Sequence, residues 1–167
     1  MSADRAPARA GASGRTSLRR RAREFVLQGL YQRQLSGNSA AAIREQIAEA
    51  AGFARTDQAY FDELWRGTCS DYEALILACA PHLARKAEEL SPIERAILVI
   101  GAWELTHRLE IPYRVVINEA VELAKSYGGT DGYKFVNGVL DRLAAEIRAT
   151  EIAALPRAGE PGVADAA

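Results

Sequence analysis

The 167-residue chain has few of the residues that build disulfide frameworks, metal sites or catalytic centres. It contains only two cysteines and two histidines. A disulfide framework normally needs more cysteines, so we expect reduced thiols and a cytoplasmic protein. Cys79 precedes His82 by three residues, but without a second pair of ligands this spacing is weak evidence for zinc. We therefore predict no metal site and no cofactor.

Long hydrophobic runs are also missing. The longest apolar stretch, residues 96–103, is far shorter than the ~20 residues that a membrane-spanning helix needs. The N-terminal sequence MSADRAPARAGASGR lacks the apolar segment of a signal peptide. We expect no association with a membrane.

Catalytic motifs are equally scarce. Ser, His and Asp are too sparsely placed to suggest a nucleophilic triad. No segment shows the alternation of a strand, so a glycine-rich phosphate loop between a strand and a helix is excluded. Glu119, Glu122 and Lys125 fit a solvated helical face. The sequence thus predicts a protein that is not an enzyme.

Charge is plentiful but unevenly distributed along the chain. The formal net charge is −1, from 21 basic and 22 acidic side chains. Residues 1–23 hold seven of the arginines and one acid, Asp4, which leaves 14 basic and 21 acidic side chains for the rest. A basic segment on an acidic body favours a polyanionic partner at one end and a different partner elsewhere.

Apolar residues recur at helical spacing through most of the chain, which predicts an all-α protein. Residues 1–16 are expected to form a disordered basic arm and residues 150–167 a disordered tail, because both have too little apolar surface to offset ordering entropy. The helical domain between them, residues 17–149, is predicted to contain about seven helices: 17–35, 39–52, 56–80, 82–90, one beginning after Ser91, 112–127 and 130–148.

Local signals place several helix boundaries and buried faces. The sequence Ser91-Pro92-Ile93-Glu94 has the serine, proline and glutamate of a capping box. Tyr127 is expected in the core at the end of its helix. Gly138, inside the last helix, is expected to permit a close helix crossing.

Arginines lead directly into the first helix, in the sequence RRRAREFVLQGLYQRQL. At ~100° per residue, Arg20, Leu27 and Tyr31 fall on one face of this helix. Arginines beside an exposed aromatic ring suit single-stranded RNA, since guanidinium groups neutralise phosphates and both groups stack on bases. The alternative is a solvated basic arm next to a half-buried Tyr31.

Glu104 lies on the apolar stripe of its helix, near Ile97 and Ile100. A carboxylate there is costly unless it is paired or covered by another molecule. Two interpretations remain open: an ion pair with Arg108 four residues later, or a place on a partner-binding surface.

The run IPYRVVINEAVELAKSYGGTDGYKFVNGVLDRL, preceded by IERAILVIGAWEL, resembles the signature region of the NusB transcription antitermination family. The first-helix sequence quoted above resembles that family's arginine-rich helix. The resemblance implies two three-helix lobes packed crosswise. It also implies binding of the boxA element of ribosomal RNA leader transcripts, as a heterodimer with ribosomal protein NusE that helps RNA polymerase to read through terminators.

The same resemblance implies where the partners bind. Glu104, in the triplet WEL, would face NusE. Two departures from the family pattern are a longer N-terminal extension with three more arginines, and Gly132 and Tyr133 in place of more polar residues. The residues implied to contact RNA are Arg19, Arg20, Arg21, Arg23, Tyr31, Asp131, Lys134 and Phe135.

Two rival functions are compatible with the sequence. One is the helical RNA-binding domain of an RNA cytosine methyltransferase; we expect a free-standing protein instead, because no α/β catalytic segment follows the last predicted helix. The other is a protein-binding scaffold, homodimeric when free, whose arginine arm only keeps it in solution. Titration with RNA at two salt concentrations separates these functions.

Overall fold

The computed structural model describes the backbone of residues 10–156 and the side chains of residues 14–156. Over this range the chain forms helices and no strands, which confirms the all-α prediction. The α-helices are α1 (Ala10–Ser36), α2 (Ala40–Ala48), α3 (Gln58–Ser70), α4 (Tyr72–Cys79), α5 (Pro92–His107), α6 (Tyr113–Tyr127), α7 (Gly132–Ile147) and α8 (Ala149–Ala154).

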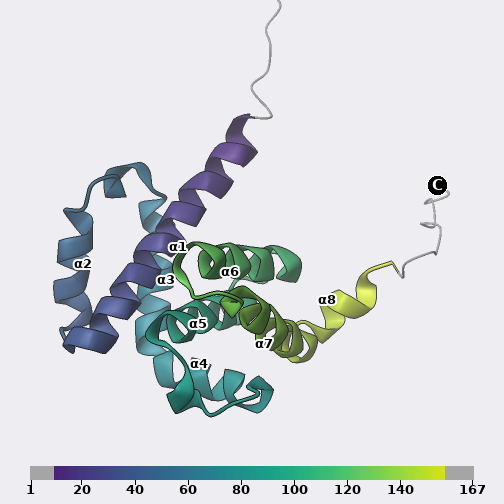
Figure 1. Ribbon diagram of the computed structural model, residues 1–167. Helices are drawn as coiled ribbons and strands as arrows, with labels where there is room; N and C mark the ends of the chain where they lie inside the picture. The colour runs from purple at the N-terminus through teal and green to yellow at the C-terminus, as the bar shows by residue number, and fades with distance from the viewer. Residues whose placement is uncertain (1–9, 157–167) are drawn as a thin grey trace, which may run out of the picture.

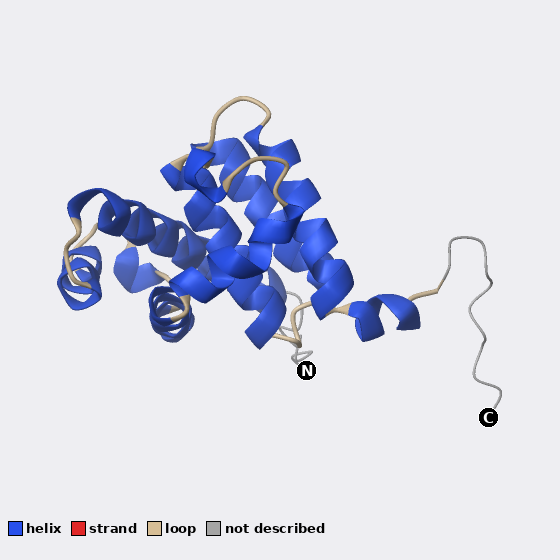
Figure 2. Cartoon of the chain, turned by 90° about the horizontal axis from the view of Figure 1, so that it is seen from below, coloured by secondary structure: helices blue, strands red, loops and turns tan. Residues whose placement is uncertain are grey.

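The helices form two lobes that cross each other (Figure 1). In the N-terminal lobe, α1 packs against α2 and α3; in the C-terminal lobe, α5, α6 and α7 pack against one another. Helix α5 also contacts α1, α3 and α4, so it joins the lobes. Figure 2 shows the same helices from below, joined by loops, with no strand in the described part of the chain. The predicted arrangement of two crosswise three-helix lobes is confirmed.

Helix α5 is central because it is apolar on all sides. Its residues from Ala96 to Leu105 are all buried. The predicted start signal is present in part: Ser91 Oγ accepts a hydrogen bond from the Glu94 N–H over 3.1 Å, and Pro92 occupies the first turn. The Glu94 carboxylate accepts from Arg85 instead of completing the capping box.

One predicted helix, 56–80, is two helices separated at Asp71. This residue has φ −102° and ψ 15°, outside the helical region, and it ends α3 and precedes α4. Aspartate favours helix ends because its side chain competes for nearby backbone groups. The break lets α3 pack on α1 while α4 packs on α5.

The helix predicted over 82–90 is wrong; the α4–α5 connection contains two short 3₁₀ turns, Ala80–His82 and Ala87–Glu89. Arginines from the C-terminal lobe hold this segment, because Arg95 donates to the Ala87 carbonyl and Arg142 to the His82 carbonyl. These contacts outweigh the modest helix propensity of the segment.

The ends of the helical region differ from the predicted boundaries. Helix α1 begins at Ala10 instead of near Ser17, so residues 10–16 of the expected arm are helical. Helix α8 lies in the expected tail, and Arg148 explains its position: this buried guanidinium donates to the carbonyls of Leu105 and Ile111. Residues 1–9 and 157–167, the remaining parts of the predicted arm and tail, lie outside the described residues.

Two smaller predictions are also wrong. Tyr127, expected in the core, is 39% exposed at the end of α6. A Cβ at Gly138 would meet only Arg142, at 3.6 Å, so this glycine is not at a close crossing. Tight approaches lie instead at other glycines: a Cβ would overlap Trp103 at Gly67 of α3, Trp65 at Gly29 of α1 and Leu140 at Gly101 of α5.

No helix in the described part of the chain is long and apolar enough to cross a membrane.

Candidate nucleic-acid interface

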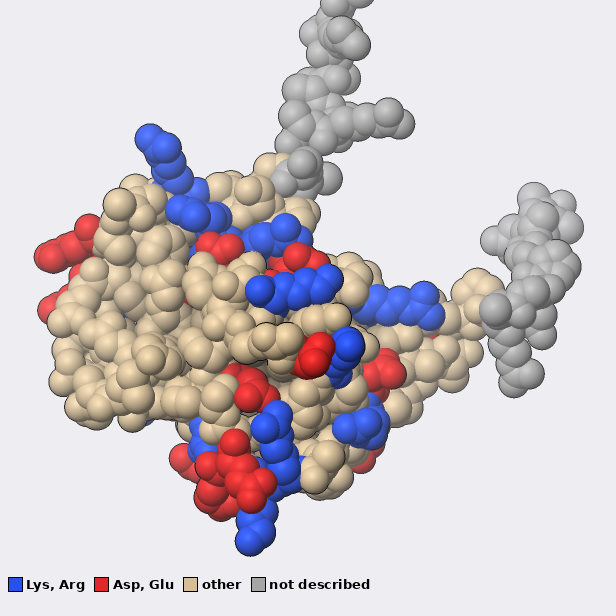
Figure 3. All heavy atoms as spheres, viewed as in Figure 1, with Lys and Arg blue, Asp and Glu red and all other residues tan. Residues whose placement is uncertain are grey.

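Four arginines predicted to bind RNA lie on the middle of α1, but the structure exposes them unequally. The side chain of Arg21 is 52% exposed, that of Arg20 48% and that of Arg19 31%, whereas that of Arg23 is 4% exposed. Figure 3 shows basic side chains interleaved with acidic ones where α1 passes over α6. Three of the four arginines therefore remain available to a ligand.

Arg23 is directed into the protein and pairs with Glu104. Its Nε donates to Oε1 over 2.7 Å and its Nη2 to Oε2 over 2.9 Å, and the Tyr60 hydroxyl donates to Oε2 over 2.7 Å. Burial alone would lower the pKa of Arg23, but the hydrogen bonds and charge of Glu104 outweigh it and raise the pKa above its ordinary value. The guanidinium stays charged, and two of its nitrogens are bonded to the buried Glu104, so Arg23 is not the exposed RNA contact that the sequence predicted.

The same pair corrects both interpretations of Glu104. Its residue is 1% exposed, so its carboxylate does not reach a partner at the surface. Arg108 does not pair with it; the Arg108 guanidinium contacts Glu63 and Glu110. Glu104 is a buried acid that ties α5 to α1 and, through Tyr60, to α3. The sequence pattern identified an unusual carboxylate, but the partner comes from a helix distant in sequence.

Arg20 is held by Glu119 of α6. Nε and Nη2 of Arg20 each donate to one carboxylate oxygen over 3.0 Å. The side-chain hydrogen bonds and the charge of Glu119 raise the pKa of Arg20. Glu119 is 6% exposed and also lies 3.7 Å from Nη1 of Arg23, so its prediction as a solvated residue is wrong. Arg20 keeps the N–H groups of Nη1 for a ligand.

Arg19 and Arg21 have looser contacts. Arg19 Nε is 3.9 Å from a carboxylate oxygen of Asp57, and its guanidinium lies over the Tyr60 ring, 4.7 Å from the centroid. Arg21 Nη1 is 3.7 Å from Glu24, one turn along the same helix. Ion pairs of this kind at an exposed site contribute only ~0–1 kcal/mol, so phosphates can displace the carboxylates.

Tyr31 lies three turns after Arg20 on the same helix and is 38% exposed. The face predicted for these residues is only partly open, because Leu27, between them, is 1% exposed and belongs to the core. Tyr31 therefore presents part of its ring to solvent from a rigid helix. Such a ring can stack on a nucleobase.

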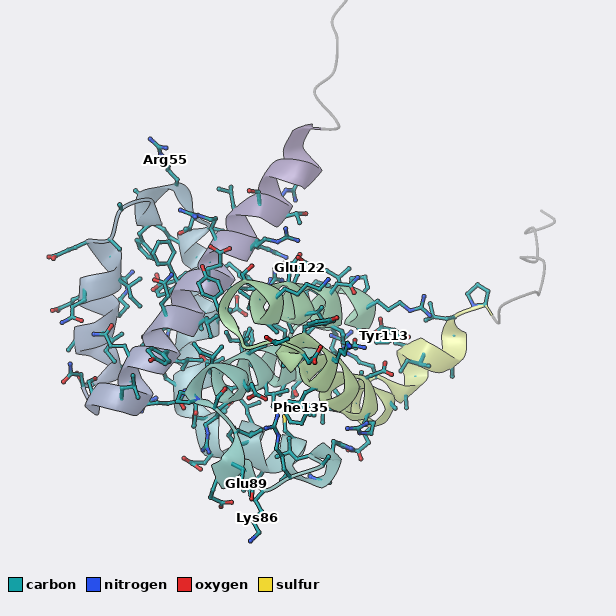
Figure 4. The ribbon with its side chains drawn as sticks, viewed as in Figure 1. Arg55, Lys86, Glu89, Tyr113, Glu122 and Phe135 are labelled. Atoms are coloured by element: carbon teal, nitrogen blue, oxygen red, sulfur yellow. The ribbon has the colours of Figure 1, made fainter. Side chains whose placement is uncertain are left out.

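The second group of predicted residues lies at the start of α7. Asp131 has φ +64° and precedes the helix, and the Lys134 ammonium is 3.3 Å from its carboxylate. Both side chains are about two-thirds exposed. Phe135 is half-buried, and the Arg85 guanidinium lies 4.3 Å from its ring centroid (Figure 4). Phe135 can therefore stack on a base of RNA only if the Arg85 side chain moves off its ring.

A small groove of about 160 Å³ connects α1 to the C-terminal turns of α6. Arg20 and Glu24 line it from α1, and Glu122 and Ser126 line it from α6. Because α6 ends at Tyr127 and α7 begins at Gly132, this groove links the arginine row with the α6–α7 turn.

The sequence did not identify Tyr60 or Glu119 as residues that support the arginines, because their partners are distant along the chain.

Among the described residues, no group of three or more His, Cys, Asp or Glu side chains could hold a metal ion. Burial raises the pKa of the Cys79 thiol to about 12, so this thiol is not a ready ligand or nucleophile at neutral pH. The arrangement is suited to binding an anionic polymer through charge and stacking.

Comparisons with known proteins agree along most of the chain. Residues 20–145 match the NusB family. Transcription antitermination protein NusB of Aromatoleum aromaticum is 55% identical over 136 residues, which cover 81% of this chain and 94% of that protein. The protein of the same name from Ralstonia nicotianae is 51% identical over 154 residues, which cover 92% of this chain and 99% of that protein.

Solved structures show the same similarity. NusB of T. maritima aligns with a TM-score of 0.69 at 31% identity, over 77% of this chain and 91% of that one. A crystal structure of antitermination factors NusB and NusE in complex with double-stranded RNA contains a chain that aligns with a TM-score of 0.70 at 25% identity. That alignment covers 78% of this chain and 98% of the other.

Proposed function

Because this chain belongs to the NusB family, we propose that it is a transcription antitermination factor that binds boxA-type leader RNA together with ribosomal protein NusE. The pair would promote read-through by RNA polymerase and so support ribosomal RNA transcription. The protein would act by binding alone, with no chemical step.

The observation that carries this proposal is the row of exposed arginines on α1. Arg19, Arg20 and Arg21 stand on one rigid helix, and none of them is buried as Arg23 is. Consecutive residues of a helix point about 100° apart, so these guanidinium groups spread over one side of α1, and each phosphate that they neutralise releases condensed counterions. The arginines lie within α1 instead of in a flexible arm, so the helix holds them in fixed positions beside an RNA path.

We assign the remaining predicted contacts by exposure. Tyr31 would stack on a base, and Lys134 would bind a phosphate at the α6–α7 turn. Asp131, next to it, would accept hydrogen bonds from base edges. Phe135 would contribute at the margin of this surface, since Arg85 covers part of its ring. Arg23 and Glu104 support the surface from behind.

The related NusB–NusE complex supports the choice of partners and leaves the strand form of the RNA to be tested. That complex contains double-stranded RNA, whereas the arginine and tyrosine arrangement suits a single strand. Both forms therefore belong in the experiment.

The test is a titration of fluorescent RNA with the full chain, alone and with purified NusE. We expect a single-stranded boxA RNA to bind more tightly than a shuffled RNA and than a duplex of the same length, and NusE to strengthen this preference. A read-through assay with RNA polymerase on a boxA template gives the functional readout. Equal binding of all three RNAs, or a homodimer without RNA affinity, would support the scaffold function instead.

A further inference from the structure

A second groove lies on the arginine side of the molecule, between the N-terminal half of α1 and the start of α6. Its volume is about 320 Å³, within the range of small-ligand sites. Arg15, Thr16 and Arg19 line it from α1, and Ile111 and Val115 line it from the opposite side. The groove is distinct from the small one that Arg20 shares with the end of α6.

The wall on α1 carries the arginines that are least engaged with carboxylates. Arg15 forms no ion pair with any described residue. Arg19 has its closest carboxylate oxygen, on Asp57, at 3.9 Å, and its Nε–H has no hydrogen-bond acceptor within the described residues. Arg20 and Arg23, by contrast, each form two short hydrogen bonds with a glutamate. An incoming phosphate therefore meets little competition at Arg15 and Arg19.

The opposite wall is apolar and partly open to water. Val115 is 41% exposed, and the buried Ile111, which precedes α6, adds a further apolar contact. The groove therefore has guanidinium groups on one wall and an exposed apolar side chain on the other. These two walls suit the two parts of a nucleotide, its phosphate and its base. The phosphate binds the cations, and the face of the base covers the apolar surface.

The floor of the groove adds a polar group. Glu119 and Arg23 both line it and both are buried. The Glu119 oxygens each accept one hydrogen bond from Arg20, so each retains a lone pair. A carboxylate oxygen there can accept from the exocyclic amino group of adenine, cytosine or guanine, which uracil lacks.

We propose that this groove binds one nucleotide of the bound RNA, with its phosphate on Arg15 and Arg19 and its amino-bearing base against Val115. The inference rests on the proposed function and adds a specificity subsite to it. The match to the NusB family begins at residue 20, so three of the residues that line the subsite, Arg15, Thr16 and Arg19, precede the matched segment.

The experiment combines one protein variant with a series of RNAs. The full chain with NusE is titrated into labelled boxA leader RNA and into copies in which one nucleotide at a time is abasic. For the wild type we expect one position where loss of the base weakens binding about tenfold, the effect of losing the burial of one to two methylene groups. Val115→Ala should weaken binding of the intact RNA about tenfold and show no further loss at that position, because both changes remove the same contact.

Charge and base identity are tested with matched variants. Arg15→Ala should reduce the dependence of affinity on salt by about one phosphate contact, relative to Arg55→Ala, which removes an exposed arginine that points away from α1 (Figure 4). Uracil at the sensitive position should bind more weakly than cytosine in the wild type. Leu77→Ala, at a 70% exposed apolar residue of α4, controls for loss of exposed apolar surface.

Two results would overturn the subsite alone, and a third would overturn the proposed function as well. If the Val115→Ala effect simply adds to the loss at every abasic position, no base lies in the groove. If RNA affinity depends equally on salt in Arg15→Ala and Arg55→Ala, no phosphate binds in the groove. A wild-type chain with NusE that binds none of the RNAs would overturn the proposed function itself, and the subsite with it.

Discussion

Arg23 of α1 and Glu104 of α5 form a buried, two-bonded ion pair although they are 81 residues apart in the sequence. The pair joins the two lobes, and Tyr60 of α3 adds a hydrogen bond to it. The arginine row of α1 therefore has two classes of member: Arg23 anchors the helix, while its neighbours face the solvent. This division leads to different expectations for substitutions in one short segment.

Arg23→Ala should destabilise the protein by ~3–5 kcal/mol, because it leaves the Glu104 carboxylate buried with only the Tyr60 hydroxyl. Glu104→Ala should cost less, since Arg23 then retains Glu119 at 3.7 Å. Urea denaturation followed by circular dichroism measures both. Near-wild-type stability of the double variant Arg23→Met/Glu104→Leu would show that the loss comes from the unpaired charge. Equal losses in the two alanine variants would contradict the role of Glu119.

Arg21→Ala should leave stability unchanged and weaken RNA binding in a salt-dependent way. Arg21 is half exposed and its one ion pair, with Glu24, is 3.7 Å long. The slope of log K against log salt should fall by ~0.7 for the lost phosphate contact on a single strand. Arg55→Ala is the control for a lost surface charge, and a slope as steep as that of the control would exclude Arg21 from the RNA path.

Tyr31→Ala should weaken RNA binding by ~1–3 kcal/mol, the range for a stacked base, with little change in melting temperature. Phe135→Ala should instead destabilise the fold by about 2 kcal/mol, less than a fully buried phenylalanine, because its ring packs against the core and under Arg85. Thermal melting and RNA titration of both variants check this contrast. A marked loss of melting temperature in Tyr31→Ala would place that ring in the core.

Glu151→Gln should lower stability at neutral pH by about 1–2 kcal/mol, because Glu151 accepts from the Tyr113 N–H at the start of α6 and from Arg148. Burial alone would raise the pKa of Glu151, but these hydrogen bonds outweigh it, and the pKa is lowered. A carboxyl with a lowered pKa stabilises the fold above its unfolded pKa of about 4.3 and loses this effect as the pH falls through its folded value. The difference between wild type and variant should therefore shrink as the pH falls below about 4, measured by denaturation across that range.

Gly138→Ala should stabilise the protein by ~0.5–1 kcal/mol, since alanine is the better helix former and a Cβ there meets only ordinary contacts. Gly67→Ala should destabilise it by ~1–3 kcal/mol, because the added methyl overlaps the Trp103 indole. Differential scanning calorimetry of both variants measures the pair. A destabilised Gly138→Ala variant would instead support the close helix crossing that the sequence predicted at this glycine.

Local patterns in the sequence determined the helical class and several helix starts of this protein. Ser39 and Ser91 each accept the N-cap hydrogen bond that their position predicts. These features follow from neighbours within four residues, which is the reach of a helix turn. The unequal distribution of arginines along the chain likewise indicated a candidate RNA surface on the first helix.

Only the tertiary structure decided which of those residues reach a ligand. Arg20 and Arg23 belong to the same arginine run. The crossing of α1 over α5 and α6 buries Arg23 and leaves Arg20 exposed. The same crossing pairs Glu104 with a distant arginine and covers Glu119, whose local pattern is that of a solvated residue. Buried charges need partners, and those partners come from helices that meet only in the folded chain, so periodicity and capping signals carry no information about them.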